Sequence, residues 1–198
     1  MAALLPAGCA TPPPAPPPRP TGRGEACLAQ LEARRVEYQL AAMPVSAGGC
    51  GIDNAVRVGR TAIPWNRAAV MDCELALILD QFEAGAVQAA ASRYFGRRVV
   101  RIDHFGSFDC RRESSGHHRW SQHAFGKAID IGGFLLADGT MIRVAEDWHR
   151  AGPRGNFLHD VARSACHEFQ LVLTPDSDAR HQDHFHLDIG PYRLCGLS

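Results

Sequence analysis

Three histidines and two aspartates fall within eight residues near the C-terminus, in the segment HQDHFHLD (residues 181–188). Side chains alternate between the two faces of a strand, so a strand here places His184, His186 and Asp188 on one face and its apolar residues on the other. The apolar face can pack on a core, and the polar face presents two imidazoles and a carboxylate side by side. Both groups are zinc ligands, so the pattern indicates metal chemistry.

A second polar cluster lies upstream, in SQHAFGKAID (residues 121–130). We expect His123 in a loop and Asp130 in the strand that follows it. Gly126 permits a tight turn, so the loop can fold back and bring His123 near Asp130. With one histidine of the late strand this gives two nitrogens and one oxygen, which leaves zinc a fourth position for water. Such an open position is typical of catalytic rather than structural zinc sites.

The elements that must position these residues follow from periodicity and from turn residues. Helical spacing predicts helices over residues 25–35, 73–94 and 156–169. We expect an irregular stretch and a polar loop over residues 46–60 and 107–122. Strands are expected over residues 98–105, 128–136, 141–145, 171–173 and 184–189, with a hairpin turn at residues 137–140. Helices come first and a largely antiparallel sheet later, so the sequence predicts an α+β fold with flanking helices, in which the sheet carries the zinc site.

Length and composition favour one core with a tail. The chain has 198 residues, of which 45% are apolar, and its 21 basic residues balance 21 acidic ones. A zero balance excludes the overall basic charge of a nucleic-acid binder, and we interpret Arg97, Arg98 and Arg101 as solvated surface. No apolar run is long enough for a membrane helix, so we expect a soluble protein or one tethered only at its end.

The N-terminal segment differs from the rest in composition. Residues 1–20 hold eight of the thirteen prolines, which prevents helix and sheet ladders and predicts an extended linker. We therefore divide the chain into an export-type linker (residues 1–24) and a single domain (residues 25–198). Cys9 follows Leu-Pro-Ala-Gly, as in a bacterial lipoprotein cleavage site. Either Cys9 carries a lipid tether to the outer membrane or it is incidental.

The remaining cysteines form an even set without a CxxC pair: Cys27, Cys50, Cys73, Cys110, Cys166 and Cys195. Their wide spacing favours disulfides in an oxidising compartment over a cysteine-ligated zinc ribbon. Six cysteines allow about fifteen pairings. We expect closure of nearest neighbours, which joins Cys27 to Cys50, Cys73 to Cys110, and Cys166 to Cys195. The alternative is a set of reduced, buried thiols.

The motifs in this order carry a resemblance to known families. SxHxxGxAxD followed by a late HxH resembles the superfamily that joins lysostaphin-type peptidases, D-Ala-D-Ala metallopeptidases and the hedgehog signalling domain. More closely, the chain resembles the bacterial extensin-like C-terminal domain family over roughly residues 27–195. That resemblance rests on GSFDCR (residues 106–111), SQHAFGKAID, the Trp148 region, the Cys166 helix and HQDHFHLD.

The resemblance implies a ligand set and a general base. It implies zinc ligands at His123, Asp130 and His186. His184, the first histidine of HxH, then lies beside the metal as general base. Asp183 stands where the D-Ala-D-Ala peptidases carry a glutamate and is a second candidate for the base, although strand alternation points it away from His184 unless the strand begins with a bulge.

The resemblance also implies residues that bind substrate. Arg111, or else Arg112, corresponds to an arginine that binds a carboxylate or a polarised carbonyl, for which a planar guanidinium is suited. Ser121 is expected to hydrogen-bond a ligand or the substrate, and His181 to contact substrate or a ligand. Asp188 is expected to orient an imidazole.

We assign four other histidines to structure: His104, His149, His159 and His167. His117 and His118 are expected at the surface or in the wall of a cleft.

The expected function is that of a zinc metallopeptidase that cleaves peptidoglycan stem peptides or cross-bridges, of the D,D- or L,D-peptidase type, as a monomer in the periplasm or cell envelope. One alternative is a non-catalytic, zinc-stabilised wall-binding or signalling module. The other is a disulfide-stapled scaffold without metal.

Overall fold

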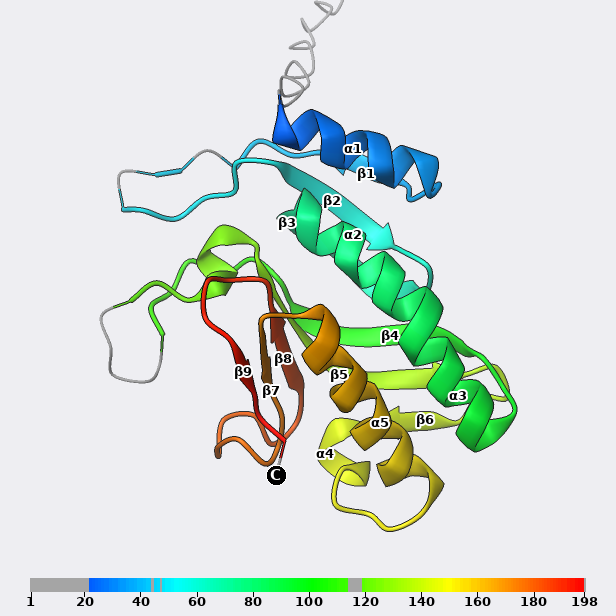
Figure 1. The fold of residues 1–198 in the computed structure, drawn as a ribbon. Coiled ribbons are helices and arrows are strands. Elements are labelled where there is room, and N and C mark those ends of the chain that lie inside the picture. Colours follow the sequence, from blue (N-terminus) through cyan, green and yellow to red (C-terminus); the bar gives the residue numbers. More distant parts are fainter. Residues whose placement is uncertain (1–21, 44, 47, 114–118, 198) are drawn as a thin grey trace, which may run out of the picture.

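The computed structural model describes residues 22–197, apart from residues 44, 47 and 114–118. In this part of the chain the predicted α+β class is confirmed. Nine strands form one mixed sheet in the order β1-β2-β3-β4-β5-β8-β7-β9, with β6 also paired to β5 (Figure 1). The pairs β3–β4 and β7–β9 are parallel and the other pairs are antiparallel. The strands are β1 (Tyr38–Leu40), β2 (Ala55–Arg60), β3 (Pro64–Asp72), β4 (Val99–Gly106), β5 (Ala128–Leu136), β6 (Met141–Arg143), β7 (Leu171–Leu173), β8 (Phe185–Asp188) and β9 (Leu194–Cys195).

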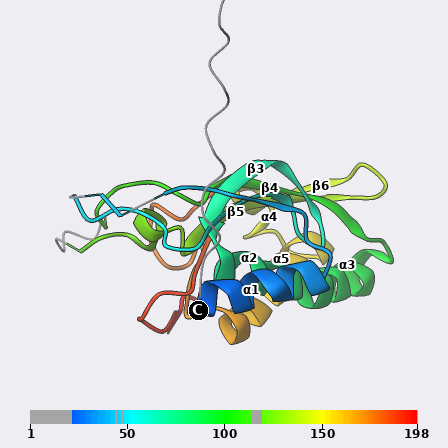
Figure 2. The ribbon, with the colours of Figure 1, turned by 90° about the horizontal axis from the view of Figure 1, so that it is seen from above.

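The main helices cover a single face of the sheet. Figure 2 shows α1, α2, α3 and α5 on the same side of the strands. Leu31 of α1, Leu75 of α2 and Phe157 of α5 are fully buried there against strand residues such as Ile129. The opposite face of β5 and β8 is therefore free to carry polar side chains. The helical segments are α1 (Arg23–Ala33), α2 (Cys73–Phe82), η1 (Glu83–Val87), α3 (Gln88–Phe95), η2 (Gln122–Phe125), α4 (Val144–Asp147) and α5 (Pro153–Glu168).

The long helix predicted over residues 73–94 is confirmed, with a feature that periodicity does not show. Its middle turn, η1, is a π-helix between α2 and α3. Glu83 in this turn is fully buried. Its carboxylate accepts hydrogen bonds from the Thr61 hydroxyl (2.6 Å), the Ile63 amide (2.8 Å) and the Trp65 indole N–H (2.8 Å). The helix is thus fixed to the turn between β2 and β3 by a carboxyl group rather than by apolar packing alone.

Two predictions of local structure are wrong. The irregular stretch over residues 46–60 ends in β2, which pairs with β3 and buries Val56 and Val58. The glycines before and within this stretch conceal its short alternating pattern. The strand over residues 141–145 ends at Arg143, and the chain continues as the short helix α4. The amide of Arg143 donates to the buried carboxylate of Asp147 at 3.0 Å, which favours a helical turn there.

Three disulfides cross-link the domain, and only one of the predicted pairings is correct. Cys166–Cys195 is confirmed. The pairings of Cys27 with Cys50 and of Cys73 with Cys110 are wrong, because the bonds are Cys27–Cys73 and Cys50–Cys110. Helix α1 packs against α2, which brings Cys27 to the first residue of α2. Cys50–Cys110 joins the loop before β2 to the loop after β4, and these loops extend from the same end of the sheet (Figure 1).

The proposed N-terminal linker, Cys9, His117 and His118 lie outside the described residues, apart from residues 22–24. The domain division therefore stays a prediction. Among the residues that are described, no helix is long and apolar enough to span a membrane.

Candidate metal centre

The ladder between β5 and β8 sets the core of the site. Asp130 of β5 lies opposite His186 of β8, and Ala128 lies opposite Asp188. Phe185 and Leu187, which alternate with these residues, are 1% exposed and belong to the main core. The predicted two-faced strand is confirmed, with a polar face on the side of the sheet away from the core.

The loop carrying His123 folds back as predicted. Ser121 caps the 3-10 turn η2 by accepting a hydrogen bond from the His123 amide at 3.3 Å. Gly126 then ends the turn in a left-handed conformation with φ 61°. That conformation favours glycine, and a methyl group here would also lie 2.9 Å from Cγ1 of Ile52. Turn and packing together hold the His123 imidazole, which is 2% exposed, over the polar face of β5.

Three ligand-type atoms meet at this point. His123 Nε2 lies 3.2 Å from Asp130 Oδ1 and 3.1 Å from His186 Nδ1, and His186 Nδ1 lies 3.0 Å from Asp130 Oδ1. Four ligands at about 2.0–2.1 Å around a tetrahedral zinc ion are separated by roughly 3.3 Å. The triangle of His123, Asp130 and His186 therefore matches one face of a zinc tetrahedron to within a few tenths of an ångström, and these residues form a group that can hold a metal ion.

Hydrogen bonds on the outer side of each imidazole fix which nitrogen faces the cluster. His123 Nδ1 donates to the carbonyl of Ser107 at 2.6 Å, so in the neutral ring Nε2 carries no hydrogen and has a lone pair. His186 Nε2 donates to Asp188 Oδ2 at 3.2 Å, so in the neutral ring Nδ1 has a lone pair. With Asp130 this places three acceptors in mutual contact. Such an arrangement is favourable only with a cation or a proton among them.

The pKa values of His186 and Asp130 are shifted in opposite directions by their mutual contact. Burial lowers the pKa of His186, but hydrogen bonds to Asp130 and Asp188 outweigh it and bring that pKa to about 9. Burial raises the pKa of Asp130, but contacts with His123 and His186 outweigh it and hold that pKa well below its usual range. Without a bound metal, a protonated His186 and an ionised Asp130 therefore stabilise each other.

His184 and Asp183 form a pair beside this cluster. His184 Nδ1 lies 2.7 Å from Asp183 Oδ1, and His184 Nε2 lies 3.6 Å from Asp130 Oδ1. The prediction that Asp183 points away from His184 is wrong. Regular strand structure begins only at Phe185, so alternation does not apply to the turn before it. Asp183, 59% exposed in its side chain, contacts the outer nitrogen of His184.

The three predicted substrate contacts line one cavity of about 460 Å³ that opens beside His186. Arg111 lies in the wall of this cavity, and its Nε is 2.9 Å from Asp109 Oδ2. Ser121 is buried at its wall. His181 binds Asp178 Oδ1 through Nδ1 at 2.9 Å, and its pKa is lowered by burial, against the raising effect of Asp178.

Arg112, the alternative to Arg111, does not belong to the residues that line this cavity. Its guanidinium lies over the Trp120 ring, 3.8 Å from the ring centre. The structure also adds Ser107 and Asp178, whose contacts fix His123 and His181. Ser107 stands in the GSFDCR motif, but its contribution is a backbone carbonyl, which residue type does not reveal. Asp178 carries no signal in sequence beyond its spacing of three from His181.

Two of the other histidines have structural contacts in keeping with the prediction. His104 is 1% exposed, and its Nε2 donates to the Arg67 carbonyl at 2.9 Å. His159 stacks on Trp148 with 3.8 Å between ring centres. His149 and His167 are exposed.

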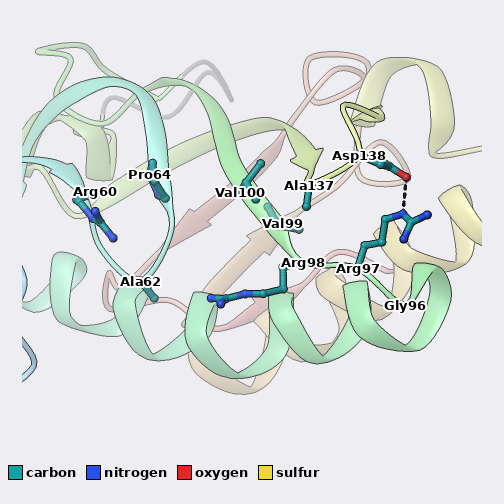
Figure 3. Close-up of a pocket in the computed structure, with 10 residues that line it drawn as sticks. All are labelled: Arg60, Ala62, Pro64, Gly96, Arg97, Arg98, Val99, Val100, Ala137 and Asp138. Carbon is teal, nitrogen blue, oxygen red and sulfur yellow. Dashed lines mark hydrogen bonds and ion pairs between the residues drawn. The ribbon is translucent and has the colours of Figure 1, made fainter.

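A further cavity, of about 600 Å³, has none of the predicted site residues in its wall. Figure 3 shows Arg60 of β2 and Arg98 before β4 reaching toward it, while Arg97 pairs with Asp138 at 2.7 Å. Arg97 and Arg98 are exposed, in keeping with the interpretation of a solvated basic surface. The wall of this cavity has no histidine or cysteine, and its carboxylate, Asp138, is paired with Arg97, so it lacks the chemistry found at the cluster of His123, Asp130 and His186.

Comparison with known proteins supports the resemblance to the extensin-like family and does not extend to the peptidase superfamily. No curated protein and no solved structure matches the chain. A family model described as "Extensin-like protein C-terminus" matches residues 25–196. This span contains the cluster, the cavity and all three disulfides, and it covers most of the 198 residues. The chain therefore belongs to the extensin-like protein C-terminus family.

Proposed function

We propose that the protein is a zinc-dependent hydrolase that cleaves peptide bonds in peptidoglycan stem peptides or cross-bridges. The observation that carries the proposal is the contact of His123 Nε2, Asp130 Oδ1 and His186 Nδ1 within 3.0–3.2 Å of one another, with His184 beside them. Two imidazoles and one carboxylate suit zinc and leave it one open position, the arrangement of catalytic sites.

The substrate and compartment are supported by two features. The motifs SxHxxGxAxD and HxH resemble those of lysostaphin-type and D-Ala-D-Ala metallopeptidases. The three disulfides are typical of proteins in oxidising compartments, which favours the periplasm or cell envelope. Peptidoglycan peptides are substrates accessible there.

The residues around the cluster supply the proton transfers. A bound zinc ion would polarise the peptide carbonyl and lower the pKa of a water molecule. His184 Nε2 accepts a proton from the attacking water, and Asp183 stabilises the resulting imidazolium through the Nδ1–H bond of 2.7 Å. The same imidazolium then gives its proton to the leaving amine nitrogen as the C–N bond breaks.

The cavity beside His186 positions the peptide. Arg111 offers a planar guanidinium to a substrate carboxylate or carbonyl. The Ser121 oxygen accepts from the His123 amide, which leaves the hydroxyl hydrogen free to donate to the peptide backbone. His181 lies on the same wall, with its ring centre 5.1 Å from that of His184. These residues bind and orient the substrate while His184 moves the proton.

The test is digestion of purified peptidoglycan, with zinc content measured on the same samples. Wild type should hold one zinc ion and release peptides that mass spectrometry identifies. His184→Ala should keep zinc and lose activity by about 10²- to 10⁴-fold, the usual contribution of a general base. His167→Ala, an exposed histidine of α5, is the matched control and should change neither quantity.

The outcomes separate the candidate functions. Zinc without peptide release, with retained binding to peptidoglycan, favours the non-catalytic wall-binding module. A protein that holds no zinc under any loading condition contradicts both.

A further inference from the structure

An exposed aromatic ring lies against the general base on the side of β4. Phe105 is 51% exposed. Its ring centre lies 5.7 Å from that of His184, at an interplanar angle of 67°. Neither residue belongs to the wall of the cavity that contains Arg111. The ring therefore borders His184 on a surface distinct from that cavity.

Side chains of β3 fix the backbone that carries this ring. Strands β3 and β4 pair directly at Trp65 and Ile102. Further along, the Asn66 side chain pairs with both backbone groups of His104: it accepts from the amide at 3.1 Å and donates to the carbonyl at 3.2 Å. Arg67 donates to the carbonyl of Phe105. The exposed ring thus stands on a backbone that is held in place.

The ring also lies directly on the neighbouring strand. A methyl group on Gly132 of β5 would come within 2.6 Å of Phe105 Cζ and 2.8 Å of Cε1. A side chain at this position would displace the ring from where it lies. The β4–β5 register shifts between Asp103 and His104, next to this contact. The tip of the ring thus packs closely on the bare backbone of β5.

We propose that Phe105 is the floor of a substrate subsite that takes the apolar side chain of a peptide residue flanking the scissile bond. This inference rests on the proposed function. A peptide bound at the cluster extends to both sides of His184. The cavity beside His186 offers arginines and polar groups to one side of the peptide. The half-exposed Phe105 ring offers an apolar surface to the other side of the peptide. Because this ring contacts His184, the side chain that it binds belongs to a residue next to the reacting bond.

The size of the effect follows from the area available. A phenylalanine side chain presents about 150–250 Å², of which about half is exposed here. Partial coverage of that half by a leucine-sized side chain, at about 25 cal/mol per Å², corresponds to roughly tenfold in affinity. A glycine at the same peptide position makes no such contact.

The test uses stem-type peptides that differ only in glycine, alanine or leucine at the position next to each candidate scissile bond. Their affinities for the zinc-loaded full chain are measured by isothermal titration calorimetry, and their turnover by mass spectrometry. Wild type should favour leucine over glycine. Phe105→Ala should weaken binding of the leucine peptide about tenfold and leave the glycine peptide nearly unchanged, and Phe105→Leu should fall between them. Val100→Ala, which removes another exposed apolar side chain of β4, should leave both affinities unchanged.

Several results would overturn the subsite. They are the absence of a leucine preference in wild type, an equal loss for all peptides in Phe105→Ala, or the same loss in Val100→Ala. Binding with a leucine preference but without turnover would contradict the proposed hydrolysis and support the subsite. Turnover without a side-chain preference would support the proposed hydrolysis and contradict the subsite. Phe105→Leu keeps the test decisive if Phe105→Ala fails to fold.

Discussion

Replacement of Asp188 by asparagine should switch the tautomer of His186 and weaken zinc binding. Asp188 uses both oxygens: Oδ1 accepts from the Gly190 amide at 2.8 Å, and Oδ2 accepts from His186 Nε2 at 3.2 Å. An asparagine has only one acceptor. If its oxygen keeps Gly190, its NH₂ group faces His186 Nε2, and the ring must carry its proton on Nδ1.

A proton on Nδ1 would occupy the nitrogen that meets His123 and Asp130. In the other orientation the amide NH₂ faces the Gly190 N–H, and the two donors leave each other without an acceptor. Because position 188 is buried, with Asp188 4% exposed, such an unsatisfied group costs about 1–3 kcal/mol. Loss of such a supporting contact typically lowers metal affinity about 10- to 100-fold, equal to roughly 1.4–2.7 kcal/mol.

The assay is competition for zinc against a chelating dye, at a pH near 7.5. Asp178→Asn is the matched control, because Asp178 supports His181 in the same way but lies outside the metal group. It should leave zinc affinity unchanged. Histidine-ring ¹⁵N NMR of the metal-free protein, recorded above the His186 pKa of about 9 so that the ring is neutral, should show the altered tautomer in Asp188→Asn. Wild-type zinc affinity in Asp188→Asn, or an equal loss in Asp178→Asn, would refute the assigned role of Asp188.

Three further predictions concern stability. Replacement of both Cys166 and Cys195 by alanine should lower the free energy of unfolding by about 3.6 kcal/mol, given their sequence separation of 29, as measured by urea denaturation. Burial raises the pKa of Glu83 to about 7, against the lowering effect of its three hydrogen bonds. The folded protein therefore holds a proton that the unfolded chain releases above its ordinary pKa, and stability should fall as pH rises from about 4.5 to 7. A urea series in which wild type and Glu83→Gln show the same pH dependence would contradict this assignment. Gly126→Ala should destabilise the protein by about 2 kcal/mol, since it combines a left-handed φ with a close approach to neighbouring atoms. Gly96→Ala, with a similar φ and open space, isolates the conformational part, and equal losses in the two variants would show that packing at Gly126 adds nothing.

The sequence predicts much of the site because local patterns encode it. Alternation in β8 places His186 and Asp188 together, and Gly126 permits the turn that returns His123 to Asp130. Each of these inferences involves residues within about ten positions of one another. The distance between His123 and His186 follows only once β5 is known to pair with β8, an expectation that the late HxH motif supports through resemblance.

The features that sequence does not predict depend on distant contacts or on backbone atoms. The disulfide Cys27–Cys73 depends on α1 packing on α2, and nearest-neighbour spacing contains no such information. Asp183 departs from strand alternation because β8 starts at Phe185. The tautomer of His123 depends on the carbonyl of Ser107, which any residue type supplies.

The alternation along β8 also limits how this segment can change. Phe185 and Leu187 fill the core, while His186 and Asp188 occupy the opposite face. Insertion or deletion of a single residue would exchange the two faces, so that imidazole and carboxylate enter the apolar interior and aromatic and aliphatic groups replace the ligands. Such a change would therefore separate the candidate ligands and also unfold the domain. We expect variants of this segment to arise by substitution and to keep its length.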